Sequence, residues 1–315
     1  MTRNICITAG EGQSGFLIAE LLLKENKFAK RIDSITSLVL DPTNPKCTEL
    51  ESLGAKIVPH HPGRERQMVK TFKEVGCDTI CVIPPAHKDK VDITIELCET
   101  AKKAKVQNRK KQPRLREFID IENIVLSSKG DPSVELGHSP CVIRAGFYAE
   151  NLLLYPQQAQ LNGILPLPIG ENHKFAPVAL GDIAYVAACV LAGKGKHGFD
   201  DRHRGQMMIV TGPMLCAGKE LAEAASQAVG QKMEFENISE REAKRILKAQ
   251  ADIDDSEKEY LLEYYSLVRE GKTNYVVTTA FHDVTGEQPT QPSEFFRMYS
   301  HELRPKKKAK TDNST

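Results

Sequence analysis

Residues 4–24 read NICITAGEGQSGFLIAELLLK, and this stretch decides the fold. Its first part, Asn4–Thr8, is a short apolar run that stops at glycines and predicts a buried strand. Its last part, Phe16–Lys24, is apolar on most faces and predicts a helix. Three glycines with the spacing G-x-G-x-x-G lie between them, at Gly10, Gly12 and Gly15.

Each glycine of this turn has a separate physical task. The first permits a tight turn, the second lets the backbone approach a diphosphate, and the third lets the helix pack closely on the strand. The backbone amides at the start of the helix would then point at the phosphates, helped by the helix dipole. The amides concerned are those of Gln13, Ser14, Gly15 and Phe16. The alternative is a plain tight turn.

Strands and helices alternate along the first hundred residues. The expected strands after the first are Ile35–Leu40, Ala55–Val58 and Thr79–Ile83, and the last of these ends at Pro84 and Pro85. The expected helices between and after them are Lys46–Leu53, Glu65–Val75 and Asp89–Ala104. Four such alternations predict an α/β fold, a Rossmann-type doubly wound parallel sheet with right-handed crossovers. Pro84 and Pro85 are therefore expected at the cofactor edge.

Asp41 ends the second strand, where an acidic side chain can accept hydrogen bonds from the adenosine ribose of a dinucleotide. Its charge would repel a 2′-phosphate, and the nearest basic residue in the sequence is Lys46. The cofactor is therefore expected to be NAD or NADP, with NAD slightly favoured. The alternative for Asp41 is the first residue of an Asp-Pro turn.

Composition restricts the class of protein. The 315 residues carry 43 Lys and Arg against 42 Asp and Glu, so direct nucleic-acid binding through bulk charge is not expected. The eight cysteines form no CxxC pair, so we expect no metal site and reduced thiols. We also expect no secretory signal and no membrane-spanning segment. These features suit a cytoplasmic protein.

Four further stretches resemble the NmrA-like branch of the atypical short-chain dehydrogenase/reductase family. Val142–Leu154 (VIRAGFYAENLLL) is similar to its strand-and-loop segment, and Gly163–Leu191 to its short strands followed by an Asp-Ile-Ala helix start. Gly205–Gly230 is similar to its strand, Thr-Gly-Pro turn and helix, and Val284–Met298 to its C-terminal Thr-Gly-x-x-Pro segment. The resemblance covers most of the chain in order. It implies an NAD(P)-binding Rossmann fold with a small C-terminal α/β lobe.

The resemblance also implies a substrate or nicotinamide pocket near residue 150. Phe147, Tyr148 and Asn151 stand where the family lines that pocket. For Asn151 the alternative is a residue that stabilises the loop. Arg144 could be a ligand contact, but a buried ion pair is the favoured interpretation. Asp182 is expected to be the N-cap of a helix over Ile183–Leu191.

The sequence departs from the family pattern at the helix expected over Arg114–Lys129. Short-chain dehydrogenases carry Tyr-x-x-x-Lys there as acid/base and ribose-binding pair. Here no Tyr is present, and Phe118 stands where some NmrA-like reductases have Lys, four residues before Glu122. The preceding segment, Lys105–Gln112, is too short and polar for the family's fifth strand. We therefore predict a sheet that lacks its central fifth strand and is gapped or re-paired there; Ile124–Ser128 as that strand is the less favoured alternative.

The expected organisation is a dinucleotide-binding domain over residues 1–145, a substrate or partner lobe over 146–303 that returns elements to the core, and a disordered basic tail over 304–315. The tail contains Pro305–Lys310 (PKKKAK), which could serve as a nuclear-localisation signal or simply be solvated. Two functions remain open. One is a redox-sensing regulatory protein that binds NAD(P) and acts on a protein partner. The other is an NAD(P)H-dependent oxidoreductase for a small carbonyl, quinone or imine substrate.

Overall fold

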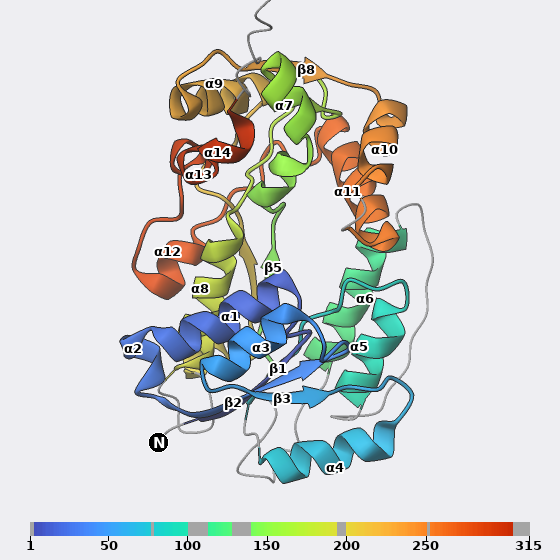
Figure 1. Cartoon of the computed structure of the whole chain (residues 1–315), viewed down its shortest axis with the longest axis vertical. Coiled ribbons are helices and arrows are strands. Elements are labelled where there is room, and N and C mark those ends of the chain that lie inside the picture. Colours follow the sequence, from blue (N-terminus) through green and yellow to red (C-terminus); the bar gives the residue numbers. More distant parts are fainter. Residues whose placement is uncertain are drawn as a thin grey trace, which may run out of the picture.

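The structure is a computed structural model of the whole chain. It describes residues 3–76, 79–99, 113–127, 140–193, 200–250 and 253–304. Figure 1 shows a molecule in two parts, a sheet-containing part that holds the N-terminal region and an upper part built mainly from later helices. The expected segment Lys105–Gln112 and the tail from residue 305 lie outside the described residues.

A parallel sheet with the order β3-β2-β1-β4 forms the core of the first part. Helices connect its strands, so the predicted alternation of strand and helix is confirmed. Gly76 ends the third long helix in the left-handed conformation with φ of 65°, as its position in the sequence predicts. The elements are β1 (Arg3–Thr8), α1 (Gln13–Lys24), α2 (Asn26–Ala29), β2 (Ile32–Val39), α3 (Pro45–Ser52), β3 (Lys56–Pro59), α4 (Glu65–Val75), β4 (Thr79–Cys81) and α5 (Lys90–Glu99).

A helix from much later in the chain completes this part. α8 (Leu180–Leu191) packs against α1, and alanines on its buried face share one apolar cluster with Ile18 and Leu22 of α1. Small side chains let the two helices approach closely. The later segment therefore returns to the core, as expected from the sequence.

The sheet does not continue beyond β4 in the described part of the chain. β5 (Val142–Ala145) instead pairs in parallel with β7 (Met207–Val210) as a separate two-stranded sheet. Cys81 of β4 and Ile143 of β5 pack on the same apolar cluster, so the two ladders are neighbours without being hydrogen-bonded in the described residues. The segment considered for the fifth strand, Lys105–Gln112, lies outside the described residues, so the loss of that strand stays a prediction.

The helix expected over Arg114–Lys129 is confirmed as α6 (Pro113–Ser127), which contradicts the alternative of a strand at Ile124–Ser128 for all but its last residue. The expected N-cap role of Asp182 is wrong. α8 begins three residues earlier than expected, at Leu180, with Ala179 as its N-cap, and the Asp182 carboxylate accepts hydrogen bonds from the amide and hydroxyl of Thr290.

The upper part is the small C-terminal α/β lobe that the resemblance implies. Its two strands pair in parallel, and helices pack on them around an aromatic core that includes Tyr155, Phe175 and Tyr265. Its elements, with the remaining short ones, are η1 (Ala149–Leu154), α7 (Pro156–Asn162), β6 (Ile164–Leu167), η2 (Asp201–His203), α9 (Gly218–Val229), β8 (Glu234–Asn237), α10 (Glu240–Lys248), α11 (Asp255–Arg269), α12 (Ala280–Thr285), α13 (Pro292–Met298) and α14 (Ser300–Leu303).

Candidate functional site

The glycine turn lies at the carboxyl end of β1 and leads into α1, at the edge where Rossmann folds bind dinucleotides. A Cβ on Gly15 would lie 2.3 Å from the carbonyl oxygen of Ala9, so only glycine allows α1 to approach the strand this closely. A Cβ on Gly10 would lie 1.6 Å from Ser37 Oγ of β2. Gly10 thus allows the turn to pack closely against β2, and Gly15 allows α1 to pack closely against Ala9.

The residue that bends the chain is Ala9, with φ of +50°. The tight turn was predicted at Gly10, and this prediction is wrong, because the residue in the left-handed conformation is Ala9. The amide of Gly12 donates to the Ala9 carbonyl at 3.0 Å and closes the turn. Alanine in this conformation costs about 1 kcal/mol relative to an ordinary backbone, which indicates a turn held by its surroundings.

The first amides of α1 are available for an anion. The N-cap of α1 is Gly12, and no side chain caps the helix. The first three amides, those of Gln13, Ser14 and Gly15, precede the first intrahelical bond, which Phe16 donates to the Gly12 carbonyl at 3.0 Å. Together with the helix dipole, these amides form a site suited to a phosphate.

A side chain of β1 ties the turn to the end of β4. The Thr8 hydroxyl donates to the Ile83 carbonyl at 3.0 Å and accepts from the Ile83 amide at 2.7 Å. These bonds hold the following residues, Pro84 and Pro85, at the same edge as the glycine turn. The structure therefore brings together the first and fourth strand ends that the sequence assigned to the cofactor.

The adenosine side of the turn contains a carboxylate that sequence analysis did not select. Glu11 Oε1 accepts the Leu40 amide at 2.7 Å and the Asp41 amide at 3.4 Å, at the end of β2. Glu11 Oε2 is buried and has no hydrogen-bond partner among the described residues. A ribose hydroxyl donated to this oxygen would satisfy it, so the residues present fit the adenosine half of a dinucleotide.

The neighbouring Asp41 is oriented into its own turn. Its Oδ1 accepts the Thr43 amide at 2.9 Å and the Thr43 hydroxyl at 2.6 Å, and these bonds lower the pKa of the carboxyl. This geometry matches the Asp-Pro turn alternative. Lys46, the nearest cation in sequence, has its Nζ 5.8 Å from the ring centroid of Phe16 on α1.

The three residues expected to line the substrate pocket occupy different environments. Phe147 is 1% exposed and packs edge-on against Phe175 at 5.2 Å between ring centroids. Tyr148 is half-buried; burial raises the pKa of its hydroxyl, and the nearby Ser14 side chain of the glycine turn opposes this shift. Asn151 lies in the first turn of η1, and its amide donates to the Tyr148 carbonyl at 3.0 Å. Tyr148 is thus the member of this group that reaches the turn.

Arg144 on β5 forms the expected ion pair. Its Nε donates to Glu122 Oε1 on α6 at 2.7 Å, and its second guanidinium nitrogen binds Oε2. This bidentate contact connects β5 to the helix that replaces the Tyr-x-x-x-Lys helix of the dehydrogenases. Phe118 of that helix packs edge-on against Tyr260 of α11 at 5.4 Å.

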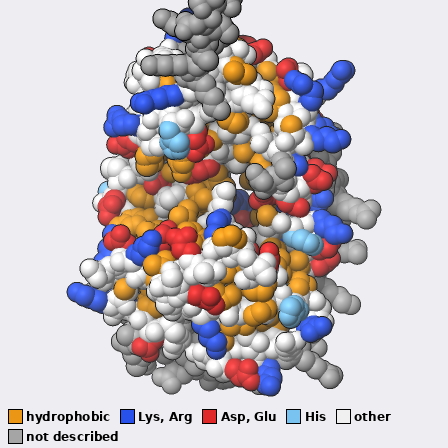
Figure 2. All heavy atoms as spheres, viewed as in Figure 1, with side chains coloured by type: hydrophobic (Ala, Val, Ile, Leu, Met, Phe, Trp, Pro, Cys, Tyr) orange, Lys and Arg blue, Asp and Glu red, His pale blue; other side chains and the backbone are white. Residues whose placement is uncertain are grey.

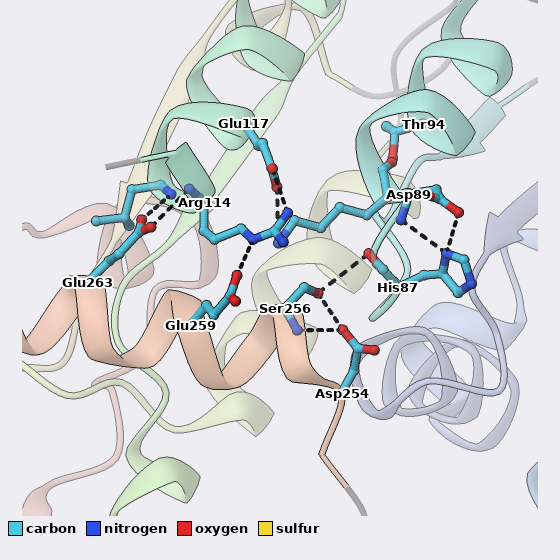
Figure 3. A network of polar contacts seen from close by, with 11 residues as sticks. His87, Asp89, Thr94, Arg114, Glu117, Asp254, Ser256, Glu259 and Glu263 are labelled. Carbon is cyan, nitrogen blue, oxygen red and sulfur yellow. Dashed lines mark hydrogen bonds and ion pairs between the residues drawn. The ribbon is translucent and has the colours of Figure 1, made fainter. Parts of the chain in front are cut away.

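Helix α11 packs against α6, and the contacts between them are made by charged side chains. Figure 3 shows Arg114 of α6 reaching Glu259 of α11, whose Oε2 accepts from Arg114 Nε at 2.8 Å. Glu263 accepts the Arg114 amide at 3.2 Å and the Leu115 amide at 2.9 Å, and so caps α6 from another helix. Figure 2 shows that the molecule is hollowed at mid-height on this face, between the two parts.

The sequence predicts a helix over Asp252–Lys272, which the structure has as α11, but it predicts neither the role of Glu11 nor the place of α11 beside α5. Glu11 lies inside the glycine motif, where its acidic side chain was itself a signal. No signal placed the N-terminal half of α11 beside α5, because the Ser256 hydroxyl and the His87 carbonyl that it contacts at 3.4 Å are 169 positions apart. Among the described residues, no group of three His, Cys, Asp or Glu side chains could hold a metal ion, and no helix is long and apolar enough to cross a membrane.

Comparison with known sequences finds two distant relatives. The chain is 27% identical over 228 residues to an NAD(P)H azoreductase of Xenophilus azovorans, covering 71% of this chain and 76% of that protein. It is also 27% identical over 225 residues to the prestalk A differentiation protein A of Dictyostelium discoideum, covering 70% of this chain and 69% of that protein. No protein-family model matches.

Comparison with solved structures confirms the fold. A nucleoside-diphosphate-sugar epimerase of Staphylococcus aureus superposes with a TM-score of 0.72 and 18% identity, covering 94% of this chain and 100% of that one. An NADPH-dependent quinone oxidoreductase of Escherichia coli, complexed with NADPH, gives 0.71 and 20%, covering 94% and 99%. NmrA, a negative transcriptional regulator, in complex with NAD gives 0.68 and 14%, covering 94% of each chain. The fold implied by the sequence resemblance is therefore the fold that the chain has.

Proposed function

We propose that this chain, which has the NmrA-like α/β Rossmann fold, binds a nicotinamide dinucleotide with its diphosphate on the amides of Gln13–Gly15. The observation that carries the proposal is the uncapped start of α1 directly behind a glycine turn too tight for any other side chain at Gly15. Charge-assisted hydrogen bonds from three amides suit the diphosphate that all such cofactors share.

The preferred cofactor is NAD(H) rather than NADP(H). The Glu11 carboxylate already accepts the Leu40 and Asp41 amides at the end of β2, and its second oxygen is buried without a hydrogen-bond partner among the described residues, which suits a neutral hydroxyl donor. A 2′-phosphate placed there would meet the negative charges of Glu11 and Asp41. The ammonium of Lys46 lies over the Phe16 ring, and its one positive charge does not balance the two carboxylates.

The activity that follows from binding has two candidates. The first is a regulatory protein that reports the state of the cofactor to a protein partner. It is supported by the sequence of α6, which contains no Tyr and instead carries Phe118 and Glu122, the latter paired with Arg144. The second is an NAD(P)H-dependent reductase. Its support is the sequence similarity to an NAD(P)H azoreductase over 71% of this chain, and a Tyr148 hydroxyl at the glycine turn.

Calorimetric titration of the full chain with NAD+, NADH, NADP+ and NADPH tests the binding proposal. We expect binding of all four through the diphosphate, with the NAD pair tighter. The same samples, mixed with a naphthoquinone or an azo dye and followed at the absorbance of the reduced nicotinamide, separate the candidates, because only a reductase oxidises the cofactor. Lack of heat with every dinucleotide would overturn the proposal.

A further inference from the structure

Four aromatic rings form a row between the two parts of the molecule. Phe118 of α6 lies edge-on to Tyr260 of α11, with 5.4 Å between the ring centroids. The Tyr260 centroid lies 6.4 Å from that of Tyr264, one turn further along α11, and the Tyr264 centroid lies 5.1 Å from that of Phe147. Phe147 stands two residues after the end of β5. The row therefore connects α6 and α11 to the loop that follows β5.

This aromatic row borders the hollow between the two parts of the molecule. Figure 2 shows the hollow at mid-height, and in the same view of Figure 1 β5 lies on one side of it while α6 and α11 lie on the other. The ring contacts run from α6 and α11 to the loop after β5, so they extend from one side of the hollow to the other. A small molecule in the hollow would therefore meet aromatic surface.

Exposure separates the middle of the row from the core of the lobe. The core rings of Phe175 and Tyr265 are 0% exposed, and the Tyr155 hydroxyl donates to the Tyr265 hydroxyl at 3.4 Å. Tyr260 and Tyr264 are only half-buried, and neither hydroxyl has a hydrogen-bond partner among the described residues. Each of these two phenols therefore has ring surface and a hydroxyl left for another molecule.

The rings at the two ends of the row are held by their surroundings. Lys90 of α5 is buried, and its Nζ lies 4.9 Å from the ring centroid of Phe118. At the other end Phe147 is 1% exposed. Tyr260 and Tyr264 are thus supported on both sides, and a surface that is already ordered loses little conformational entropy when it binds a ligand.

We propose that Tyr260 and Tyr264 form the subsite for the electron acceptor of the reductase candidate, and that this acceptor is a planar, uncharged bicyclic quinone. The inference rests on the proposed dinucleotide binding. Phenol rings are electron-rich and quinones are electron-poor, so the two stack favourably. The bound quinone gains a hydride from NADH and a proton from water, which gives the hydroquinone and NAD+.

The two hydroxyls favour an acceptor that has a carbonyl oxygen. Burial raises the pKa of the Tyr264 hydroxyl to about 12 and also raises the pKa of the Tyr260 hydroxyl. Both groups therefore keep their protons at neutral pH and can donate hydrogen bonds to a quinone oxygen. An anionic acceptor is less suited, because it would approach a helix that carries the carboxylates of Glu259 and Glu263.

Equilibrium dialysis of a quinone against the full chain saturated with NAD+ tests the subsite, because the oxidised cofactor permits binding without turnover. The probe is 2,3-dimethyl-1,4-naphthoquinone, whose substituted ring does not add to the cysteine thiols. Tyr260→Leu and Tyr264→Leu remove one ring each, and we expect each to raise the Kd for this quinone about tenfold. The Kd for NAD+, measured by calorimetry, should change less than about threefold.

Tyr275→Leu is the matched control. Tyr275 is 91% exposed and lies in the segment between α11 and α12, outside the row. The same substitution there should leave the Kd for the naphthoquinone and the Kd for NAD+ unchanged.

A smaller quinone separates stacking from hydrogen bonding. Tetramethyl-1,4-benzoquinone has one ring, so the two leucine variants should weaken its binding only about threefold. The double variant Tyr260→Phe/Tyr264→Phe keeps both rings and removes both donors. It should weaken binding of the two quinones to the same extent, about fivefold.

NMR of the wild-type chain tests the subsite without a substitution that removes a ring, and thermal unfolding checks that each variant is folded. The chain has eight tyrosines, whose ring signals can be assigned from single Tyr→Phe variants after carbon-13 labelling. The naphthoquinone should shift the ring signals of Tyr260 and Tyr264 and leave the signal of Tyr275 in place.

Each outcome decides one of the two proposals. If the wild type binds no dinucleotide, the proposed function fails, and the inference that rests on it fails too. If it binds NAD+ but not the naphthoquinone, or binds the naphthoquinone without a shift at Tyr260 and Tyr264, the subsite fails while the dinucleotide proposal stands. Folded leucine variants with the wild-type Kd for the naphthoquinone would also overturn the subsite.

Discussion

The two sides of the cleft are built in different ways. The glycine-turn side comes from residues 3–99 and is held by a continuous four-stranded parallel ladder. The opposite side is assembled from α6, β5 and α11, three segments far apart in the sequence. Side chains connect these segments, chiefly the Arg144–Glu122 pair and the contacts of Arg114 with α11.

Because of this difference, binding of the cofactor and the use of the bound cofactor depend on different sides of the cleft. Backbone amides and close glycine packing define the first side, and these depend little on side-chain identity beyond the glycines. Side-chain pairs define the second side, which therefore can change its chemistry while the first is kept. The absence of a Tyr-x-x-x-Lys pair from α6 is consistent with a cleft whose two sides have diverged to different degrees.

The largest effect that separates the two sides is expected from Gly15→Ala. The added Cβ would lie 2.3 Å from the Ala9 carbonyl oxygen, so α1 must move and its first amides lose their alignment. Losing two or more charge-assisted hydrogen bonds should weaken NADH binding on the order of 100-fold by calorimetry. Gly181→Ala on α8 is the control, since a Cβ there meets nothing within 4 Å. Equal NADH affinity in both variants would show that the turn does not bind the diphosphate.

On the other side, Arg144→Met should reduce stability without abolishing binding. It leaves the Glu122 carboxylate, whose side chain is 12% exposed, without its bidentate partner. We expect the free energy of unfolding to fall by about 2 kcal/mol in denaturant titrations.

The comparison pair for Arg144→Met is Lys70–Glu74 on α4, with side chains 75% and 61% exposed. Lys70→Met should change stability by less than about 0.5 kcal/mol. The double variant Arg144→Met/Glu122→Leu should recover part of the loss, because no unpaired charge remains. An Arg144→Met protein as stable as the wild type would mean that this pair does not stabilise the packing of β5 on α6.

Glu11→Gln tests the adenosine end of the first side. The neutral amide keeps the shape of Glu11 but removes one of the two charges that a 2′-phosphate would meet. We expect the preference for NADH over NADPH, measured as the ratio of their Kd values, to fall roughly fivefold, which is the effect of about 1 kcal/mol of repulsion. An unchanged ratio would leave Glu11 without a role in cofactor choice.

The smallest expected effect is that of Ala9→Gly. The left-handed conformation costs alanine about 1–2 kcal/mol, and glycine removes that cost. Glycine also makes the unfolded chain more flexible, which offsets about 0.4–1 kcal/mol of the gain. The free energy of unfolding should therefore rise by about 0.5 kcal/mol with NADH affinity unchanged. A loss of stability would indicate that the turn needs the alanine methyl group.

The sequence predicts the first side well because its signals are local. Apolar runs, helix periodicity and glycine spacing identify β1–β4 and the helices α1, α3, α4 and α5 within a few residues, and the Gly76 cap is correct. The short helix α2 was not predicted. The error at Ala9 arises because glycine spacing does not say which residue of the turn bends. For Asp41, the turn was predicted only as the alternative to ligand binding. In the structure, two hydrogen bonds from Thr43 hold its carboxylate in that turn and compete with any ligand.

The second side is harder to predict because its contacts are distant in sequence. The helix at Arg114 and the ion pair of Arg144 follow from periodicity and from the cost of burying a lone charge. The partner of Arg144 and the position of Asp182 against Thr290 depend on the packing of segments that lie about 20 to 110 positions apart. The spacing of residues within one helix or strand does not predict contacts of this kind.

Amide hydrogen exchange of the glycine turn, with and without NADH, tests the central claim most directly. If the diphosphate lies on the start of α1, NADH should slow exchange at Gln13, Ser14 and Gly15, which have no intrahelical acceptor in the protein alone. NADH that binds but protects amides elsewhere, and leaves these three exchanging at their original rates, would contradict the account.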